Sequence, residues 1–213
     1  MTDSLIRPFE MDADKVAFAQ EFLGRRIWGF KKDVNICLTT STEGNHAFMP
    51  ALMTCISFLD LLSGLRVGLV DGHKMDDFLA FMREFGPRYD EWHLRILYVV
   101  IRHKLAHLGH PLFVLNTATE PKRIGGPPML LGWKISRDAH EPPIAVYDLG
   151  GVWEVKGQPV PWAIYVTHEI HISIRTIAND APLIAEAYFQ RLRTDRHLMD
   201  NFSKCMHEFY QCF

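Results

Sequence analysis

Residues 102–110 read RHKLAHLGH and place three histidines and an arginine within nine positions, directly after the apolar run LRILYVVI. Histidine gains and loses a proton near neutral pH and is also a common metal ligand. Arginine presents a fork of donors that suits phosphate or carboxylate oxygens. The stretch could therefore be a metal site, a metal-free acid–base site, or the solvated end of a buried helix.

A metal site on this stretch would need three ligands on one helix face. At about 100° per residue, His103, His107 and His110 fall within about 60° of arc, which suits zinc or another ion that prefers imidazole. However, Gly109 and Pro111 should end the helix before His110. Acidic side chains occur only more than two turns earlier on the same helix. We therefore expect no metal and no cofactor.

The interpretation as a solvated helix end has a physical basis, because the last carbonyls of a helix lack partners and favour positive charge nearby. The preceding residues favour a more enclosed position, since they form two apolar stripes. These stripes are Leu94, Leu97, Tyr98, Ile101, Leu105 and Leu108, and Ile96, Val99, Val100 and Ala106. A helix that is apolar on two sides is packed on two sides. Its charged end should therefore face a groove or an interface.

A second cluster, His168-Glu-Ile-His171, lies in the alternating segment AIYVTHEIHISIRTI. Alternation with a period of two predicts a β-strand, in which residues three apart point to opposite faces. His168 should face the core with the isoleucines, and His171 should face the polar side. The two histidines should therefore not bind one ion.

The first half of the chain should be helical, because its apolar residues recur at helical spacing. The predicted helices are DKVAFAQEFLGRRIW from Asp12 or Asp14, a largely buried segment from about Ala47, MDDFLAFMREF, and Asp90 to about Leu108. The polar segment LTTSTEGNH should form a loop or turn between the first two.

The second half of the chain has a different pattern. After Pro111, proline and glycine separate the short β-like runs LFVLNT, MLLGWKI, IAVYDL and VWEV, and the alternating segment follows. Asn179 or Asp180 should then cap a C-terminal helix, with Pro182 near its first turn.

We predict one mainly α domain over residues 1–213 with a small β-containing (α+β) portion in its C-terminal half. Its helical core should cover about 12–110, its β-rich segment about 111–177 and its C-terminal helix about 180–212.

Composition and charge are those of a globular protein, with 48% hydrophobic and 23% charged residues and a formal net charge of −2. This charge gives no global case for nucleic-acid binding, although a cleft can focus a local field. The longest apolar runs are far shorter than a membrane span, and the N-terminus lacks a hydrophobic signal core. We expect a cytoplasmic protein with no membrane contact. The scattered Cys37, Cys55, Cys205 and Cys212 favour reduced thiols over disulfides or a zinc cluster.

The segment Arg102-His-Lys-Leu-Ala-His107, late on an apolar helix, resembles the HEPN superfamily motif. That motif is written R-x4–6-H, usually with Asn, Asp or His directly after the arginine. The helical order of roughly residues 10–110 is also similar to that family, particularly to uncharacterised bacterial HEPN-like proteins with the form LYxxxRxxLxHxxxP. Tyr98, Arg102, Leu105, His107 and Pro111 fit this form approximately.

The resemblance implies a HEPN-like helical bundle and, in active members, a metal-independent endoribonuclease that is commonly dimeric. His107 would be the acid or base that moves a proton at the 2′-hydroxyl or the leaving 5′-oxygen. Arg102 would be the phosphate clamp, and His103 would orient both groups or share the proton transfer. The residues expected to contact an RNA or nucleotide substrate are Lys104, Arg95 and His110.

The resemblance also implies a homodimer through the motif helix. Arg102 and His107 lie about 140° apart on an ideal helix, so one helix alone converges poorly on a single phosphate. Two motifs that meet across an interface would overcome this, and the second apolar stripe is a candidate for that interface.

The chain departs from the toxin-type members that pair with a nucleotidyltransferase antitoxin. Those proteins often have a tyrosine just after the motif histidine, whereas Leu108-Gly109-His110 follow here. Many HEPN-like proteins have lost activity, so a catalytically inactive dimeric binding module is the main alternative, and a histidine-liganded metalloprotein is a further one. Sparse basic residues around the motif argue against tight non-specific RNA binding there.

Overall fold

The computed structural model describes residues 12–39, 41–42, 45–99, 115–119, 121–156 and 161–211. The helices in these residues are α1 (Asp12–Thr39), α2 (Phe48–Val67), α3 (Met75–Phe85), α4 (Glu91–Leu97), α6 (Ile174–Leu192) and α7 (Arg196–Gln211). The strands are β1 (Ser41–Thr42), β2 (Asn45–His46), β3 (Leu115–Asn116), β4 (Leu130–Ser136), β5 (Ile144–Glu154) and β6 (Tyr165–Ser173).

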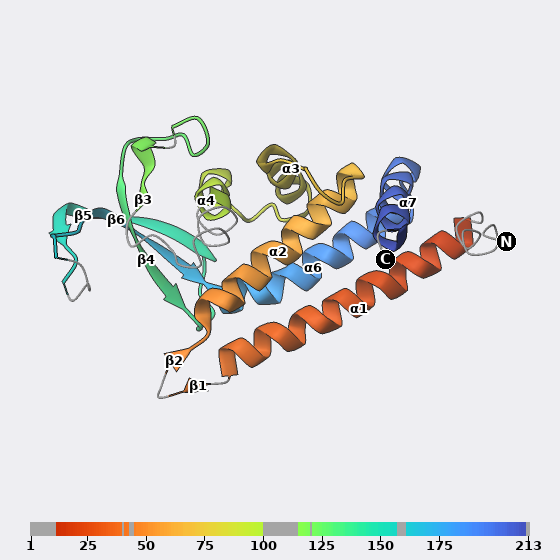
Figure 1. Cartoon of the computed structure of the whole chain (residues 1–213), viewed down its shortest axis with the longest axis horizontal. Helices are drawn as coiled ribbons and strands as arrows, with labels where there is room; N and C mark the ends of the chain where they lie inside the picture. Colours follow the sequence, from red (N-terminus) through yellow and green to blue (C-terminus); the bar gives the residue numbers. More distant parts are fainter. Residues whose placement is uncertain are drawn as a thin grey trace.

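The described part of the chain is mainly helical, with a four-stranded sheet in its C-terminal half, as the sequence predicts. Figure 1 shows α1, α2 and α6 running alongside one another, with the sheet at one end of this bundle and α7 at the other. A single cluster of buried apolar side chains extends through the helices and the inner face of the sheet.

Helix α1 is longer than the predicted segment, because it continues past Trp28 to Thr39. The buried side chains Phe30, Val34 and Leu38 explain this continuation, since they recur every four residues and keep one helix face in the core. The loop expected over residues 38–46 therefore begins later and contains the short antiparallel pair β1–β2.

Helix α2 is the centre of the bundle and contacts α1, α3, α6 and α7. Within the described residues it is the one helix long and apolar enough to cross a membrane, but 61% of its apolar window is buried inside the protein. Its neighbours account for this burial, which is that of a core helix.

A polar pair lies inside this apolar core. His73 Nε2 lies 2.9 Å from Oδ1 of Asp60 on α2, which is hydrogen-bond distance. The side chain of Asp60 is 8% exposed and that of His73 is 7% exposed. The chain reaches His73 by turning at Gly68, which closes α2 in the left-handed region at φ 76°. The pair therefore fixes the connection between α2 and α3 against the core.

The larger sheet has the strand order β3-β4-β6-β5. Strands β4 and β6 are parallel, and the other neighbours are antiparallel. The two predicted runs IAVYDL and VWEV belong to the single strand β5, whose register shifts between Asp148 and Trp153. Such an irregularity lets a long strand bend without leaving the sheet.

Strand β6 has the predicted alternation. Val166, Ile170 and Ile172 are buried, and they share a face with His168. His171 lies on the other face, where its ring is 4.5 Å from the ring of Tyr147 on β5.

The predicted start of the next helix at Asn179 or Asp180 is wrong, because α6 begins at Ile174, directly after β6. Ser173 is the N-cap: its side chain accepts a hydrogen bond from the Thr176 backbone N–H at 3.2 Å. Pro182 therefore lies inside α6 and not in its first turn.

The predicted single C-terminal helix over 180–212 is also wrong, since two helices occupy this region. α6 ends at Leu192, and Asp195 then accepts a hydrogen bond from the Leu198 backbone N–H at 3.2 Å, so a new helix begins. The apolar side chains Leu198, Phe202 and Met206 recur every four residues on α7 and are buried.

Candidate functional site

Helix α4 precedes the predicted motif in the sequence. It begins after Asp90, whose side chain accepts a hydrogen bond from the His93 backbone N–H at 3.0 Å, as the predicted start requires. Members of both predicted apolar stripes are buried in its described part: Leu94, Ile96, Leu97, Tyr98 and Val99.

The two sides of α4 meet different elements. The ring of Tyr98 lies 5.2 Å from that of Phe78 on α3, and α4 also contacts β5. Figure 1 shows α4 between the sheet and α3. The prediction that this helix is packed on two sides is therefore confirmed for residues 94–99.

The motif itself lies outside the described residues, which stop at Val99 and resume at Leu115. The predicted roles of Arg102, His103, Lys104, His107 and His110 therefore remain predictions. Arg95 is the predicted site residue that the structure describes.

Arg95 is held by neighbouring groups. Its guanidinium donates to Glu91 Oε1 at 2.9 Å and to the backbone carbonyl of Arg123 at 3.4 Å. Asp76 Oδ1 lies 3.9 Å away. A phosphate at Arg95 would therefore compete with a carboxylate that already binds the same fork of donors.

Glu91 binds two arginines at once. Arg83 of α3 donates to its other oxygen, Oε2, at 2.7 Å. The hydrogen bonds from Arg83 and Arg95 hold the pKa of the Glu91 carboxyl below its usual value. Glu91 therefore links the surfaces of α3 and α4 at the start of α4.

A tight turn covers the start of α4. Trp92 Nε1 donates to the carbonyl of Gly125 at 3.2 Å. Gly126 has φ 76°, and a Cβ there would lie only 2.7 Å from Trp92 Nε1. Glycine thus lets this turn approach the indole, and the contact fixes residues 121–126 on α4.

His93 lies nine residues before Arg102 in the sequence and was not predicted as a site residue. Burial lowers its pKa, and the Asp90 carboxylate, 3.8 Å from Nδ1, partly opposes this effect. The imidazole is therefore held more strongly in its neutral form than a free histidine. Its position two residues after Glu91 was visible in the sequence, but its burial was not.

The second histidine cluster is divided as predicted. His168 Nδ1 lies 2.9 Å from Thr167 Oγ1, whereas His171 Nε2 lies 2.5 Å from Glu169 Oε2 on the other face of β6. Within the part of the chain that the structure describes, no group of three or more His, Cys, Asp or Glu side chains could hold a metal ion.

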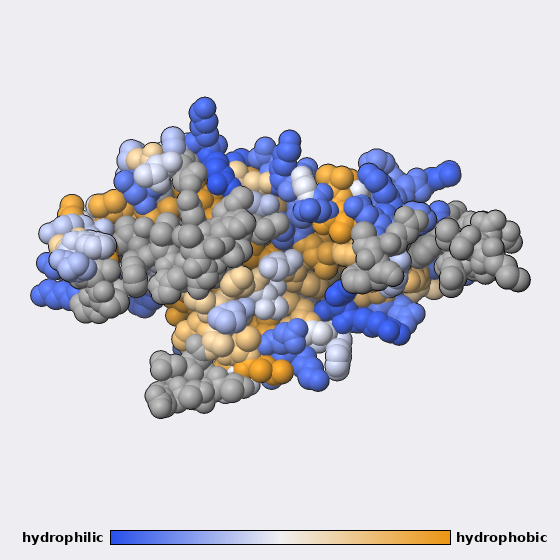
Figure 2. Space-filling model, in the orientation of Figure 1, coloured by the Kyte–Doolittle hydropathy of each residue, from blue (hydrophilic) through white to orange (hydrophobic). Residues whose placement is uncertain are grey.

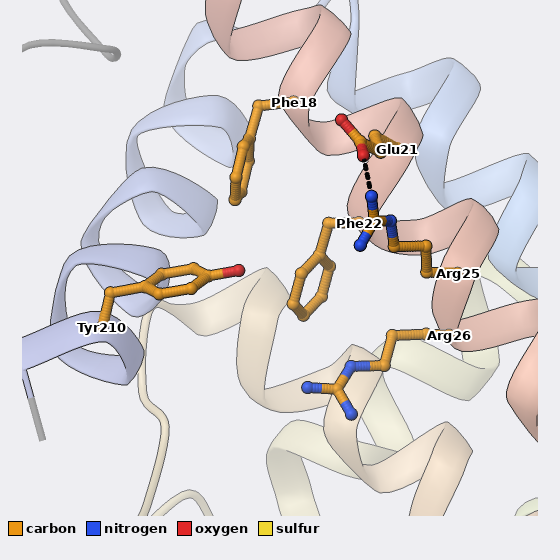
Figure 3. A pocket seen from close by; sticks show the side chains of 6 residues that line it. All are labelled: Phe18, Glu21, Phe22, Arg25, Arg26 and Tyr210. Carbon is orange, nitrogen blue, oxygen red and sulfur yellow. Dashed lines mark hydrogen bonds and ion pairs between the residues drawn. The ribbon is translucent and has the colours of Figure 1, made fainter. Parts of the chain in front are cut away.

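A pocket of about 400 Å³ that was not predicted lies between α1 and α7. Figure 3 shows its lining, which consists of Phe18, Glu21, Phe22, Arg25 and Arg26 from α1 and Tyr210 from α7. The adjacent residues Arg25 and Arg26 were the sequence feature that could have pointed to this pocket. Tyr210 could not be added to it, because only the fold brings α7 beside α1.

Comparison with protein-family models, curated proteins and solved structures finds no match to this chain.

Proposed function

We propose that this chain is a metal-independent endoribonuclease of HEPN type, in which His107 and Arg102 act at a groove between two copies of the motif helix. The observation that supports this proposal is the position of the motif directly after a helix packed on both faces. The residues that precede the motif are therefore fixed by packing as far as Val99.

The proposed step needs no metal or cofactor. The 2′-oxygen attacks the adjacent phosphorus, the bond from phosphorus to the 5′-oxygen breaks, and one fragment keeps a cyclic 2′,3′-phosphate. The 2′-hydroxyl proton goes to a base, and the leaving 5′-oxygen receives a proton from an acid; His107 serves one of these roles. Arg102 stabilises the charge on the non-bridging oxygens, and His103 orients the pair.

Two features characterise the start of α4, which precedes the motif in the sequence. Burial favours the neutral form of His93, and Glu91 neutralises Arg83 and Arg95 in part. The start of α4 therefore contributes little free positive charge, so phosphate binding would depend on Arg102, Lys104 and residues elsewhere.

The proposal is tested with labelled RNA in the presence of EDTA. We expect cleavage of the RNA and no cleavage of the same sequence with 2′-O-methyl groups, because the attacking hydroxyl is then blocked. The Arg102→Ala variant should lose about 100-fold or more in rate. Wild-type protein that leaves RNA intact would contradict the proposal and favour the inactive binding module. Equal cleavage of the methylated strand would contradict the proposed step.

A further inference from the structure

The middle of α1 carries a concentrated basic surface. Between residues 22 and 32 the sequence FLGRRIWGFKK has four basic residues and no acidic one. The exposed side chains that we call the α1 surface are Arg25, Arg26, Trp28 and Lys32, whereas Lys31 lies beside α6 on another side of the helix. This cluster contrasts with the net charge of −2 for the whole chain.

Aromatic rings lie among these charges. Trp28 is 67% exposed, and Lys32 Nζ lies 5.0 Å from the centre of its ring. In Figure 2 hydrophilic and hydrophobic residues lie side by side along the lower edge of the molecule, where Figure 1 places α1. An exposed indole next to a lysine has the character of a platform on which a base can stack.

The pocket between α1 and α7 continues this pattern. The ring centres of Phe18 and Tyr210 are 6.0 Å apart, and those of Phe18 and Phe22 are 6.3 Å apart. Figure 3 shows the Tyr210 hydroxyl directed into the space between the two phenylalanines. Tyr210 is 63% exposed, so a flat ligand can reach the pocket from solvent.

The two arginines of the pocket differ in their freedom to bind an anion. Arg25 forms an ion pair with Glu21, which also lines the pocket. The Arg26 guanidinium lies 5.1 Å from the centre of the Phe22 ring, and no acidic side chain among the described residues pairs with it. Arg26 therefore carries most of the available charge at this point.

A second hollow of about 480 Å³ lies on the other side of these arginines, between α1 and α2. Arg25 and Arg26 line both hollows. Asp33 lines the second one and limits its positive charge.

We infer that the α1 surface and the adjoining pocket bind single-stranded RNA. The pocket rings would stack an unpaired base, Arg26 would contact a phosphate, and Trp28 with Lys32 would contact further nucleotides along the helix. An acidic peptide could pair with the basic side chains, but its carboxylates would not stack on the aromatic rings of the pocket. An anionic membrane would need a wider apolar face than Trp28 supplies.

This inference rests on the proposed function only for the choice of RNA as ligand. Binding is therefore measured apart from cleavage, with a fluorescein-labelled 2′-O-methyl oligouridine of about 12 nucleotides. The anisotropy of the dye reports the dissociation constant for the full chain.

We expect Arg26→Ala to weaken binding about fivefold or more and to make binding less sensitive to salt, because one phosphate contact is lost. Tyr210→Ala should weaken binding by a similar factor, whereas Tyr210→Phe keeps the ring and should stay within about twofold of wild type. Arg193→Ala is the matched control, since Arg193 also lies over a ring, that of Phe189, on α6. Circular dichroism establishes that each variant is folded.

The inference is overturned if wild-type protein does not bind the oligonucleotide, or if Arg193→Ala weakens binding as much as Arg26→Ala. Binding to phosphatidylserine vesicles without binding to the oligonucleotide would overturn it in favour of a membrane. Tight binding through Arg26 together with no RNA cleavage would uphold the inference and contradict the proposed nuclease. If Arg26→Ala cleaves RNA at the wild-type rate and no oligonucleotide binds at α1, the proposed nuclease is upheld and the inference is contradicted.

Discussion

The charged side chains of this protein differ in whether they pair with one another or stay available to a ligand. Glu91 is occupied by Arg83 and Arg95, and Asp60 is occupied by His73. Arg26 has no such acidic partner among the described residues and lies over an aromatic ring instead. Side chains that neutralise one another mainly fix the fold, whereas an unneutralised arginine on the surface is available to a ligand.

The buried pair gives a prediction about stability. Asp60→Ala should reduce the free energy of unfolding by about 3 kcal/mol, because His73 is then left in the core without its carboxylate. Urea denaturation at neutral pH measures this change. Asp33→Ala, at an exposed position, should change stability by less than about 0.5 kcal/mol. Equal effects of the two substitutions would contradict the assigned role of the Asp60–His73 pair.

The cysteines give a prediction about reactivity. Burial raises the pKa of the Cys55 thiol to about 12 and that of Cys205 to about 11. Both thiols are therefore protonated at about pH 8, and the reactive thiolate is scarce. In a Cys212→Ser variant of the native protein, Ellman's reagent should react rapidly with the half-buried Cys37 alone. Urea should expose Cys55 and Cys205, and a rapid reaction of these two thiols without urea would contradict their burial.

At the scale of secondary-structure elements, α4 is fixed from several directions. Asp90 caps its start, Trp92 binds the turn at Gly125, and Glu91 joins it to Arg83 of α3. The sheet and α3 cover its apolar sides. The element that leads into the motif is therefore constrained before the motif begins.

Two adjacent glycines test the turn that rests on α4. Gly125 and Gly126 both have positive φ, at 72° and 76°, but only a Cβ on Gly126 would meet Trp92. Gly125→Ala should cost about 1 kcal/mol for the left-handed backbone. Gly126→Ala should cost at least about 1 kcal/mol more, because the indole must move. Urea denaturation compares the two variants, and equal losses would mean that the contact with Trp92 contributes nothing.

The elements that the sequence predicts well are those with local signals. Helix α3 has the predicted bounds, because acidic residues begin it and Gly86-Pro87 follow it. The start of α6 was missed, because Ser173 belongs to the alternating pattern of β6 while its side chain already caps the helix. The sequence alone does not show that the backbone changes from strand to helix at Ser173, so this cap could not be recognised from the sequence.

The candidate sites differ in the same way. The Arg102–His107 motif is a local pattern on one segment, so the sequence can propose it. The pocket at Arg26 needs Tyr210, which is close only because α7 packs against α1. Pockets made by distant segments depend on tertiary packing, and no spacing rule reveals them.

At the scale of the whole molecule, two proposed functions occupy different parts of one helical protein. The bundle of α1, α2 and α6 carries the α1 surface (Figure 1), and the motif follows α4 in the sequence. Net charge alone argues against RNA binding, but the clustering of Arg25, Arg26 and Lys32 produces a local field that the total conceals.

The central claim is that His107 moves a proton during RNA cleavage. The most direct test is the rate at which one labelled RNA is cut in EDTA by wild-type protein, His107→Ala and His197→Ala, all purified in parallel. His197 is an exposed histidine of α7 and serves as the matched control. We predict that His107→Ala loses about 100-fold or more in rate, while His197→Ala retains the wild-type rate. Cleavage by His107→Ala at the wild-type rate would contradict the account.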